Sequence, residues 1–371
     1  MISRLDVKRP TLILDEDRGR RNIGRMKEKA DAARVKLRPH FKTHQSAEVG
    51  RWFAEAGIEA ITVSSVSMAE YFAGAGWSDI LIAFPVNPRE LDAIGALAAH
   101  TRLALLIDAP DVLPDLSRAL HNPVSVWVKV DCGYGRVGIP WDDSDRIASL
   151  ASQIRGFDHL SFAGILTHSG HTYHARTADA IRAIASEVSA RIQEVRSRVE
   201  AAGLRPCAVS IGDTPSCSLQ EEFPGVDDIR PGNFVFYDAM QHQLGVCRDE
   251  DIAVAVAAPV VSVYPRRGEI AVYAGAVHLS KESIPGDGGL PVYGYLFDGA
   301  GDRLGRLIRD APVVRLSQEH GIVHIPSTRG QDPRIGDLVL IAPVHACLTA
   351  NLYSRYRTLD GRMLSRRREE G

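Results

Sequence analysis

The arrangement in this sequence with the clearest chemical use is a lone lysine between two histidines. It lies in the segment Arg38-Pro39-His40-Phe41-Lys42-Thr43-His44. Lys42 follows a short apolar run, Val35–Leu37, that is typical of a β-strand. A lysine at the mouth of a strand can be partly desolvated, which lowers its pKa and frees the amine to attack an aldehyde. The segment therefore predicts a lysine that forms a Schiff base, although most lysines on polar turns are simply solvated.

A second candidate site is the pair His345 and Cys347, just after the apolar run Leu338–Ile341. Residues two apart on a strand face the same side, so this pair can offer an imidazole nitrogen and a thiolate to one cation. That combination of ligands suits zinc. Two ligands make half of a tetrahedral site, so water or substrate would fill the open positions. Taken alone, a His-x-Cys pair is more often a coincidence.

Two turns that contain glycine indicate an anion site. They are Gly212-Asp213-Thr214-Pro215-Ser216 and Gly232-Asn233. Glycines let backbone N–H groups approach an anion, and Thr214 and Ser216 add hydroxyl donors. Each turn alone is more often an ordinary turn, but together they predict a divided phosphate cup.

The elements that must position these residues form an alternating series from about residue 10 to 240. Amphipathic segments such as Arg18–Ala33 and Thr177–Ala202 predict helices between the apolar runs. The apolar runs read as strands buried on both faces, and they are Val35–Leu37, Ala60–Val63, Ile80–Phe84, Leu103–Ile107, Val124–Val130, Phe162–Leu166, Ala208–Ile211 and Phe234–Phe236. Eight βα units predict a closed parallel barrel of about 250 residues, with the active site at the carboxyl ends of the strands. An open doubly wound sheet is the competing architecture.

After about residue 250 the pattern changes to short strands separated by Gly/Pro turns. The predicted strands are Ile252–Val263, Glu269–Ala276, Val292–Phe297, Val313–Ile325 and Asp337–Ile341, with Thr11–Leu14 completing the sheet. We therefore expect an α/β protein with a (β/α)8 barrel over residues 15–245. A β domain over 246–371, with the first strand in 1–14, would carry the metal pair. The segment Val277–Glu282 reads as a solvated hairpin tip.

Composition excludes several classes of protein. Among 371 residues the net charge is -2 and the Lys and Arg residues are dispersed, so we expect no nucleic-acid partner. No apolar stretch approaches the ~20 residues of a membrane helix, and the charged start does not resemble a signal peptide. The five cysteines are odd in number and lack CxxC spacing, which favours a reducing cytoplasm. The terminal Arg366-Arg367-Arg368 run reads as a solvated tail.

The segment Gly133-Tyr134-Gly135-Arg136-Val137-Gly138 matches the GxGxxG pattern and follows a predicted strand. A dinucleotide site also needs a helix that opens at this point. The following residues, Ile139-Pro140-Trp141, place any helix too late, so we reject this interpretation.

Together these motifs resemble the fold type III pyridoxal phosphate (PLP) enzymes, in particular the metal-dependent D-serine dehydratase and D-threonine aldolase group. The likeness runs over nearly the whole chain, and its motifs in order are Arg38–His44, Thr167–Tyr173, Gly212–Ser216, Arg230–Asp238 and His345–Cys347. It implies an alanine-racemase-like barrel, a C-terminal β domain, PLP, a divalent metal and a homodimer.

The resemblance also implies roles for single residues. Lys42 would hold PLP and take the Cα proton, and Arg136 would lie near the cofactor's phenolic oxygen. His168 would sit against the pyridine ring, and Tyr173 would contact cofactor or substrate. The remaining implied roles are phosphate binding by Gly212, Thr214, Gly232 and Asn233, an approach of Arg230 to the ring nitrogen, and zinc or manganese binding by His345 and Cys347.

The activity that this implies is loss of water from a D-3-hydroxy amino acid of D-serine, D-threonine or D-3-hydroxyaspartate type, giving a 2-oxo acid and ammonia. In this group the aldolases tend to carry His-x-Asp and the dehydratases His-x-Cys, so Cys347 favours dehydration over retro-aldol cleavage. Asp213 departs from the serine usual in dehydratases, and Leu348 replaces a commoner proline. A racemase and a non-catalytic PLP-binding protein are the further alternatives. The β domain argues against the latter.

Overall fold

A computed structural model of the protein describes residues 6–298, 303–325 and 333–367. The chain forms two compact units. The barrel unit contains residues 25–42 and 53–232, and the β unit contains the residues up to Gly24, residues 43–52 and the chain from Asn233 onward. Within the described residues the chain therefore passes from one unit to the other four times, between Gly24 and Arg25, Lys42 and Thr43, Trp52 and Phe53, and Gly232 and Asn233.

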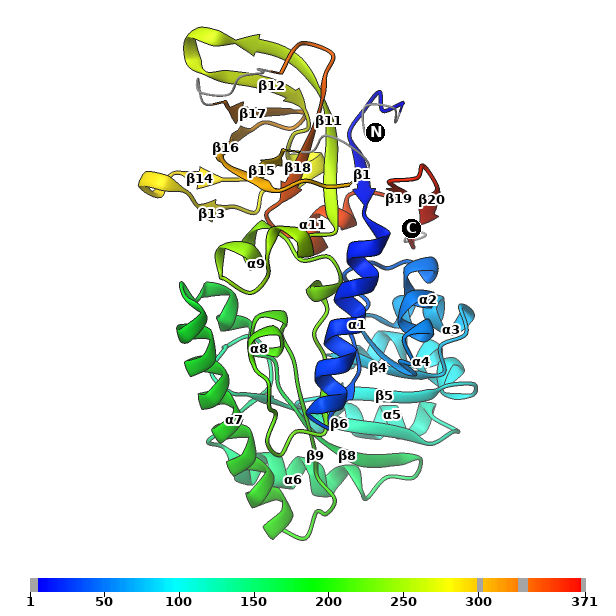
Figure 1. Ribbon diagram of the computed structural model, residues 1–371. Helices are drawn as coiled ribbons and strands as arrows, with labels where there is room; N and C mark the ends of the chain where they lie inside the picture. Colours follow the sequence, from blue (N-terminus) through cyan, green and yellow to red (C-terminus); the bar gives the residue numbers. More distant parts are fainter. Residues whose placement is uncertain (1–5, 299–302, 326–332, 368–371) are drawn as a thin grey trace. The chain divides into compact units, whose positions relative to one another are not determined.

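The barrel unit is built on eight parallel strands, in agreement with the predicted (β/α)8 architecture (Figure 1). Their order around the sheet is β2-β10-β9-β8-β6-β5-β4-β3. A bridge between His40 and Thr62 joins the segment after β2 to β3, so the ring closes. The strands are β2 (Lys36–Leu37), β3 (Ala60–Val63), β4 (Asp79–Pro85), β5 (Arg102–Ile107), β6 (Val124–Asp131), β8 (Leu160–Leu166), β9 (Ala208–Ile211) and β10 (Asp228–Ile229).

Buried aliphatic side chains on these strands explain why the ring forms. Leu81, Leu106, Trp127 and Leu166 pack into one cluster from four different strands. Burying one large apolar side chain contributes about 1.5–3 kcal/mol, and neighbouring strands of a parallel sheet bury both faces. Because the bridge from the segment after β2 to β3 closes the ring, the competing open sheet is not found.

Helices connect the strands, and the two that the sequence delimited best begin and end close to the predicted positions. Thr177 caps α7 by accepting from the N–H of Ala180, and Gly203 follows the helix with a positive φ of 82°. The helices are α1 (Glu16–Ala32), α2 (Ala47–Glu55), α3 (Val66–Gly74), α4 (Leu91–Ala98), α5 (Leu113–Ala119), α6 (Ser144–Ile154), α7 (Ala178–Ala201) and α8 (Thr214–Leu219). A two-residue strand, β7 (Ile139–Pro140), precedes α6, so no helix opens at the GxGxxG segment.

The eighth barrel strand lies earlier than the apolar run predicted. β10 is Asp228–Ile229, and Asn233–Val235 forms a 3₁₀ turn, η5, instead of a strand. The run Phe234–Phe236 is fully buried, which explains why it resembles a strand in the sequence. The correction places Arg230 after the last strand, at its carboxyl end.

The β unit contains a closed antiparallel ring. Its order is β12-β17-β16-β15-β18-β11, and a further pairing of β11 with β12 closes it. The first strand, β1 (Thr11–Leu14), pairs antiparallel with β11. The other strands are β11 (Val254–Tyr264), β12 (Glu269–Tyr273), β15 (Gly294–Phe297), β16 (Leu307–Leu316), β17 (His320–His324), β18 (Leu338–Pro343), β19 (Arg355–Thr358) and β20 (Met363–Ser365), with β13 (Ile284–Pro285) and β14 (Pro291–Val292) paired separately.

Three details of this unit differ from the sequence predictions. The segments Val292–Phe297 and Val313–Ile325 were each predicted as one strand, but each contains parts of two strands. The segment predicted as a hairpin tip contains a short helix, α10 (Ala276–Leu279), because Leu279 is fully buried and anchors it. The remaining short helices are α9 (Ala239–Gln243) and α11 (Ala346–Asn351).

The third difference concerns the carboxyl end. Arg367 is buried and its backbone N–H donates to the carbonyl of Gln45 at 2.6 Å. The backbone of Arg366 donates to Ser354 at 3.0 Å. These two residues are therefore part of the folded β unit rather than a solvated tail, while Arg368 lies outside the described residues.

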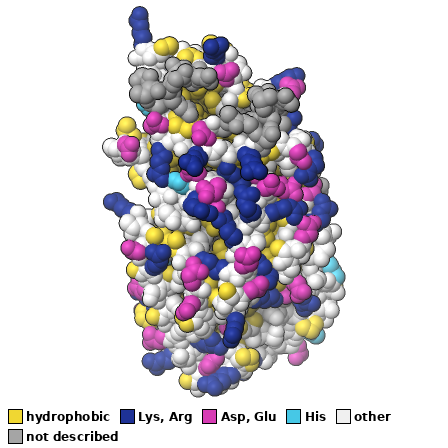
Figure 2. All heavy atoms as spheres, in the orientation of Figure 1, with side chains coloured by type: hydrophobic (Ala, Val, Ile, Leu, Met, Phe, Trp, Pro, Cys, Tyr) yellow, Lys and Arg dark blue, Asp and Glu magenta, His cyan; other side chains and the backbone are white. Residues whose placement is uncertain are grey.

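The surface agrees with the composition. On the face shown in Figure 2, basic and acidic side chains are interspersed. Within the described ranges, no helix has the length and apolar character needed to cross a lipid bilayer. Four of the five free cysteines are buried, as expected for small apolar side chains, and Cys347 is partly exposed.

Candidate active site

Lys42 follows the short strand β2 in the barrel unit. The residue two before it, His40, forms the bridge to β3, and the N–H of Lys42 lies 3.4 Å from His40 Nδ1. The side chain of Lys42 is exposed, so the partial desolvation expected from its place beside a strand is not found. Burial and the charges of Lys42 and Arg230 lower the pKa of His40 well below its usual value. A neutral His40 can keep Nδ1 as an acceptor for the Lys42 backbone.

Several residues predicted for the cofactor lie within electrostatic reach of one another. Burial lowers the pKa of His168 well below its usual value, and the charges of Arg136 and Lys42 lower it further. The charges of Arg136 and Arg230 act on His40 in the same way. The barrel unit thus brings Lys42, Arg136, His168 and Arg230 together, although they lie in four separate segments of the sequence.

His168 follows β8, and its imidazole is held by the backbone of a neighbouring segment. Its Nδ1 lies 2.6 Å from the carbonyl oxygen of Gly212, which follows the adjacent strand β9. A carbonyl accepts only, so Nδ1 carries the proton and the neutral ring leaves Nε2 as an acceptor. The imidazole is therefore fixed in one tautomer between two strand ends.

The predicted phosphate cup lies at the ends of β9 and β10. A Cβ atom at Gly212 would come within 2.9 Å of Arg230, so only glycine fits this close approach of two segments. Thr214 begins α8, and its Oγ1 is buried without a hydrogen-bond partner among the described residues. The N–H of Thr214 lies 3.4 Å from the hydroxyl of Tyr173. An orphaned hydroxyl beside glycine backbone fits a phosphate group.

Arg230 is a buried cation at the same end of the barrel. Its Nε donates to Ser210 Oγ at 2.6 Å, and its Nη2 donates to the carbonyl of Thr167. Burial lowers the pKa of Arg230 to about 10, against the raising effect of Asp228. The guanidinium therefore remains charged at neutral pH, as a cation beside a cofactor ring nitrogen would need to be.

Asp213 does not act as a free anion in the cup. Its carboxylate caps α8 by accepting from the N–H of Ser216 at 2.7 Å, and it also accepts from the hydroxyl of Thr172 at 2.9 Å. Burial raises the pKa of Asp213, while these hydrogen bonds oppose that change. Asp213, which stands where dehydratases usually have a serine, thus links α8 to the turn η4 (Gly170–His174), which carries Tyr173.

Tyr134 is a residue near these groups that the sequence interpretation assigned no role. Its ring lies 5.7 Å from the ring of His168 and 6.1 Å from that of His171, and the Arg136 guanidinium lies 5.4 Å from it. A Cβ atom at Gly170 would come within 2.3 Å of the Tyr134 ring. The tyrosine therefore packs directly against the backbone of η4. The feature of the sequence that could have identified Tyr134 is its position in the loop after β6.

Lys129 is a second overlooked residue of the barrel unit. It lies on β6, is almost fully buried, and donates to the carbonyl of Val130 at 3.1 Å. Burial lowers the pKa of Lys129 to about 7, and the nearby charge of Arg230 contributes. A lysine inside an apolar strand run is unusual, and that was the sequence signal for it.

The predicted metal pair lies in the β unit, where β18 ends and α11 begins. The side chains of His345 and Cys347 are hydrogen-bonded to each other. Burial lowers the pKa of His345, but Cys347 and the charges of Asp238 and Glu282 outweigh burial and raise it to about 9. A paired imidazole and thiol fit one divalent cation. Across the described part of the chain, no cluster of three or more His, Cys, Asp or Glu side chains is arranged around a possible metal position.

Two polar groups approach the sulfur of Cys347. Thr43 Oγ1 lies 3.2 Å from Sγ, and Asn233 Nδ2 lies 3.7 Å from it. The side chain of Asn233 therefore lies beside Cys347, and the assignment of this residue to the phosphate stays a prediction. Thr43 directly follows Lys42 and was not singled out from the sequence.

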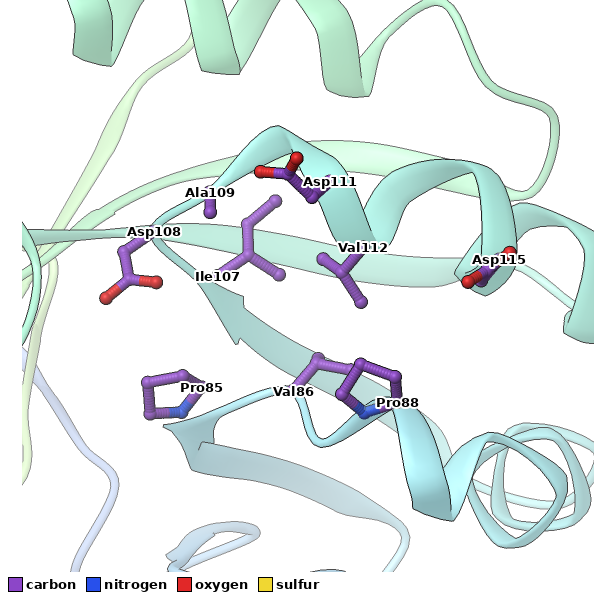
Figure 3. Close-up of a pocket in the computed structure, with 9 residues that line it drawn as sticks. All are labelled: Pro85, Val86, Pro88, Ile107, Asp108, Ala109, Asp111, Val112 and Asp115. Atoms are coloured by element: carbon purple, nitrogen blue, oxygen red, sulfur yellow. The ribbon is translucent and has the colours of Figure 1, made fainter.

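A separate cavity of about 190 Å³ opens at the carboxyl ends of β4 and β5 in the barrel unit (Figure 3). Pro85, Val86 and Ile107 form apolar walls, and Asp111 and Asp115 come from the segment that follows β5. None of the residues predicted for the cofactor lines this cavity. We assign it no ligand.

Comparison with known proteins agrees with this architecture. Residues 14–239 match the family described as "Alanine racemase, N-terminal domain", and residues 253–359 match the "Putative serine dehydratase domain". A D-serine dehydratase from Dictyostelium discoideum is 32% identical, over 95% of this chain and 93% of that protein. A D-threo-3-hydroxyaspartate dehydratase from Delftia sp. is 31% identical, over 96% of this chain and 95% of that protein.

A solved structure of a D-threo-3-hydroxyaspartate dehydratase variant, in a metal-free form, is similar over 99% of both chains, with a TM-score of 0.89 and 30% identity. A 3-hydroxy-D-aspartate aldolase from Paracoccus denitrificans is 26% identical, over 95% of this chain and 88% of that protein. PLP is the cofactor expected for this fold family. The chain therefore belongs to the alanine-racemase-like, fold type III family of PLP enzymes, within the group of lyases that contains the D-serine and D-threo-3-hydroxyaspartate dehydratases.

Proposed function

We propose that the protein is a PLP- and zinc-dependent lyase that removes water from a D-3-hydroxy amino acid and releases a 2-oxo acid and ammonia. The substrate would be of the D-serine, D-threonine or D-3-hydroxyaspartate type, as the names of the relatives indicate. One observation carries the proposal: His345 and Cys347 are paired, and Cys347 contacts Thr43, the residue directly after Lys42.

The cofactor would be held by the barrel unit. Lys42 would bind it covalently, and the orphaned hydroxyl of Thr214 with the backbone at Gly212 and Gly232 would hold its phosphate. PLP, when bound there, supplies an electron sink for negative charge at the substrate's Cα. The residues proposed to surround the ring are Arg136, His168, Tyr173 and Arg230.

Proton transfer at the substrate is proposed for Lys42. Its amine would be the base that accepts the Cα proton, because its side chain is exposed at the strand ends where the cofactor residues converge. Tyr173 would contact cofactor or substrate beside the phosphate cup, since its hydroxyl lies 3.4 Å from the Thr214 N–H. Loss of the proton and of the β-hydroxyl gives an enamine that hydrolyses to the 2-oxo acid and ammonia.

The metal would be zinc, with manganese as the alternative, and it would be held by His345 and Cys347. Hydroxide is a poor leaving group, and a divalent cation supplies Lewis acidity worth several kcal/mol to the developing charge on oxygen. A site with two protein ligands keeps positions open for a substrate hydroxyl. The existence of a metal-free form of a related dehydratase supports a metal in this group.

Retro-aldol cleavage to glycine and an aldehyde is the second candidate, since several relatives are aldolases. It would use the same residues, with a base that removes the β-hydroxyl proton instead of expulsion of hydroxide. Cys347 favours dehydration. A racemase is the third candidate, and it would need no metal.

Further properties are proposed from the resemblance and from composition. The protein would be a cytoplasmic homodimer without nucleic-acid or membrane partners. Residues 15–245 would act as the PLP-binding domain, and residues 246–371, with the first strand in 1–14, as the domain that carries the metal pair.

Metal removal tests the proposal. The enzyme is reconstituted with PLP, treated with a chelator, and assayed for 2-oxo acid from D-serine, D-threonine and D-threo-3-hydroxyaspartate. We expect activity to disappear, to return with zinc, and to be absent from Lys42→Ala and Cys347→Ala variants. Full 2-oxo acid formation by the chelated enzyme would refute the metal-dependent reaction. Loss of optical activity of the substrate without any 2-oxo acid, unaffected by the chelator, would establish the racemase.

A further inference from the structure

A buried carboxylate lies behind the metal pair. Asp238 is 1% exposed and caps α9, where its Oδ1 accepts from the N–H of Gln241 at 2.9 Å. Its Oδ2 accepts from the backbone N–H of Ala346 at 2.9 Å and from Nδ2 of Asn233 at 2.6 Å. Ala346 stands between His345 and Cys347, so one carboxylate fixes both the backbone of the metal pair and the amide beside it.

The backbone conformation of the residue before Asp238 indicates that the fold requires this arrangement. Tyr237 has a φ of 46°, in the left-handed region that a buried non-glycine residue adopts only at an energetic cost. Such strain persists where surrounding structure demands it, and it is concentrated at functional sites. Here the left-handed residue directly precedes the carboxylate that faces Asn233 and Ala346.

The carboxylate determines which way the Asn233 amide points. The atom of Asn233 that lies 2.6 Å from Asp238 Oδ2 must be the nitrogen, because that carboxylate oxygen already accepts from Ala346. The same Nδ2 lies 3.7 Å from Cys347 Sγ and can donate its second hydrogen to a thiolate. The other end of the amide, Oδ1, is buried and has no partner among the described residues.

A buried acceptor without a partner indicates a missing donor. The Cys347 thiolate and a metal-bound nitrogen of His345 have no hydrogen to donate, and no ring N–H of His345 donates to Oδ1 in this structure. A water or a hydroxyl group bound to a divalent cation is a strong donor. The orphaned Oδ1 therefore fits the molecule that would occupy an open metal position.

We propose that Asp238 is a positioning residue that orients Asn233, so that Nδ2 donates to the Cys347 thiolate and Oδ1 accepts from the water or substrate hydroxyl on the metal. The inference rests on the proposed metal site and adds a requirement on the ligand that can bind there. A ligand in the open position must carry a hydrogen that it can donate to Asn233, as a β-hydroxyl does and an ether or a halide does not. Outer hydrogen bonds of this kind orient the ligands and tune their donor strength.

Cobalt(II) is the probe for the test, because thiolate coordination to cobalt produces a charge-transfer band in the near ultraviolet. The full-length enzyme with PLP is stripped of metal and titrated with Co²⁺, and affinity and band position are recorded. Asp238→Asn replaces the carboxylate that accepts from Asn233 with an amide, so Asn233 is no longer oriented by it. We expect this variant to bind Co²⁺ about 10–100-fold more weakly. Asn233→Ala removes the N–H donor, so the sulfur becomes more electron-rich and the band moves to longer wavelength.

Because Asp238 acts through Asn233, its substitution should shift the band in the same direction. The double variant should then show no larger shift than Asn233→Ala alone. Asp251→Asn is the matched control, since Asp251 is also a buried capping carboxylate, accepting from the N–H of Arg248 at 2.8 Å. We expect it to lower the melting temperature while leaving Co²⁺ affinity and the band unchanged.

The outcomes separate the inference from the proposed function. If wild-type enzyme gives no thiolate band, the proposed metal site is wrong. If wild-type gives the band but Asp238→Asn and Asn233→Ala keep its position and the affinity, the positioning role is wrong while the metal site stands. Additive shifts in the double variant would also overturn it, and Asn233→Ala alone decides the case if Asp238→Asn fails to fold.

Discussion

The hydroxyl of Thr43 lies 3.2 Å from the sulfur of Cys347, and Thr43 is joined to Lys42 by one peptide bond. A second such connection exists at Gly232 and Asn233, where a residue of the proposed phosphate cup precedes one at the metal pair. The two candidate sites lie in different compact units, but the chain joins them directly at two places.

The buried Lys129 should make folding stability depend on pH. Burial lowers its pKa from 10.5 to about 7, so between these values the unfolded chain binds a proton that the folded protein does not. Stability therefore rises with pH in this window. From pH 7 to pH 9 the contribution is about 2 kcal/mol, since one pKa unit corresponds to about 1.4 kcal/mol.

Urea unfolding at the two pH values checks this prediction. Replacing the lysine, as Lys129→Met, should remove about 2 kcal/mol of the pH-dependent gain in the free energy of unfolding. Lys8→Met is the control, because the Lys8 side chain is 82% exposed and should leave the pH dependence unchanged. Equal pH dependence in wild-type and Lys129→Met would show that the buried lysine keeps its proton.

The contact of Tyr134 with Gly170 predicts a strong coupling between these residues. A methyl group at Gly170 would come within 2.3 Å of the Tyr134 ring, so Gly170→Ala should destabilise the protein by about 1–3 kcal/mol, as overpacking does. The displaced ring would no longer pack beside His168 and Arg136, so PLP affinity should fall as well. In a Tyr134→Ala background the same substitution should cost less than about 0.5 kcal/mol.

A double-mutant cycle measured by chemical unfolding and PLP titration tests this coupling. Strict additivity of the two substitutions would contradict the packing of Tyr134 against the turn that carries Tyr173.

The carboxyl-terminal segment should stabilise the residues that follow Lys42. Gln45, with a φ of 45°, accepts a backbone hydrogen bond from Arg367 at 2.6 Å, and the carbonyl of His44 accepts one from the hydroxyl of Tyr356 at 2.6 Å. A chain that ends at Ser365 leaves the buried Gln45 carbonyl without its donor. An unsatisfied buried polar group costs about 1–3 kcal/mol.

We expect this truncation to lower the free energy of unfolding by about that amount and to reduce turnover, because it loosens the segment beside Lys42. The matched control ends at Arg367 and keeps the hydrogen bond. Equal stability of the two truncated chains in urea unfolding would show that Arg366 and Arg367 contribute nothing.

The sequence was sufficient for the elements that rest on local patterns. The strands buried on both faces, the helix Thr177–Ala202 with its glycine stop, and β1 in the β unit all follow from apolar runs and capping residues. The eighth strand was misplaced because Phe234–Phe236 is buried as a strand would be, while the real strand contains only Asp228 and Ile229. Burial alone does not distinguish a strand from a buried turn.

Contacts between distant segments could not be read from the sequence. Thr43 and Asp238 became relevant only when folding brought them to Cys347 and to Ala346, 304 and 108 residues away in the chain. Asp213 looked like a charge beside the phosphate cup, but its two oxygens are occupied by Thr172 and Ser216. The residue types predicted the chemistry, and the fold determined which partners each side chain has.

Product identification tests the central claim most directly. The enzyme with PLP and zinc is incubated with D-threonine, and the products are identified by proton NMR. We predict 2-oxobutyrate, formed together with ammonia and abolished in Lys42→Ala. Glycine with acetaldehyde would contradict it and establish the aldolase reaction despite Cys347.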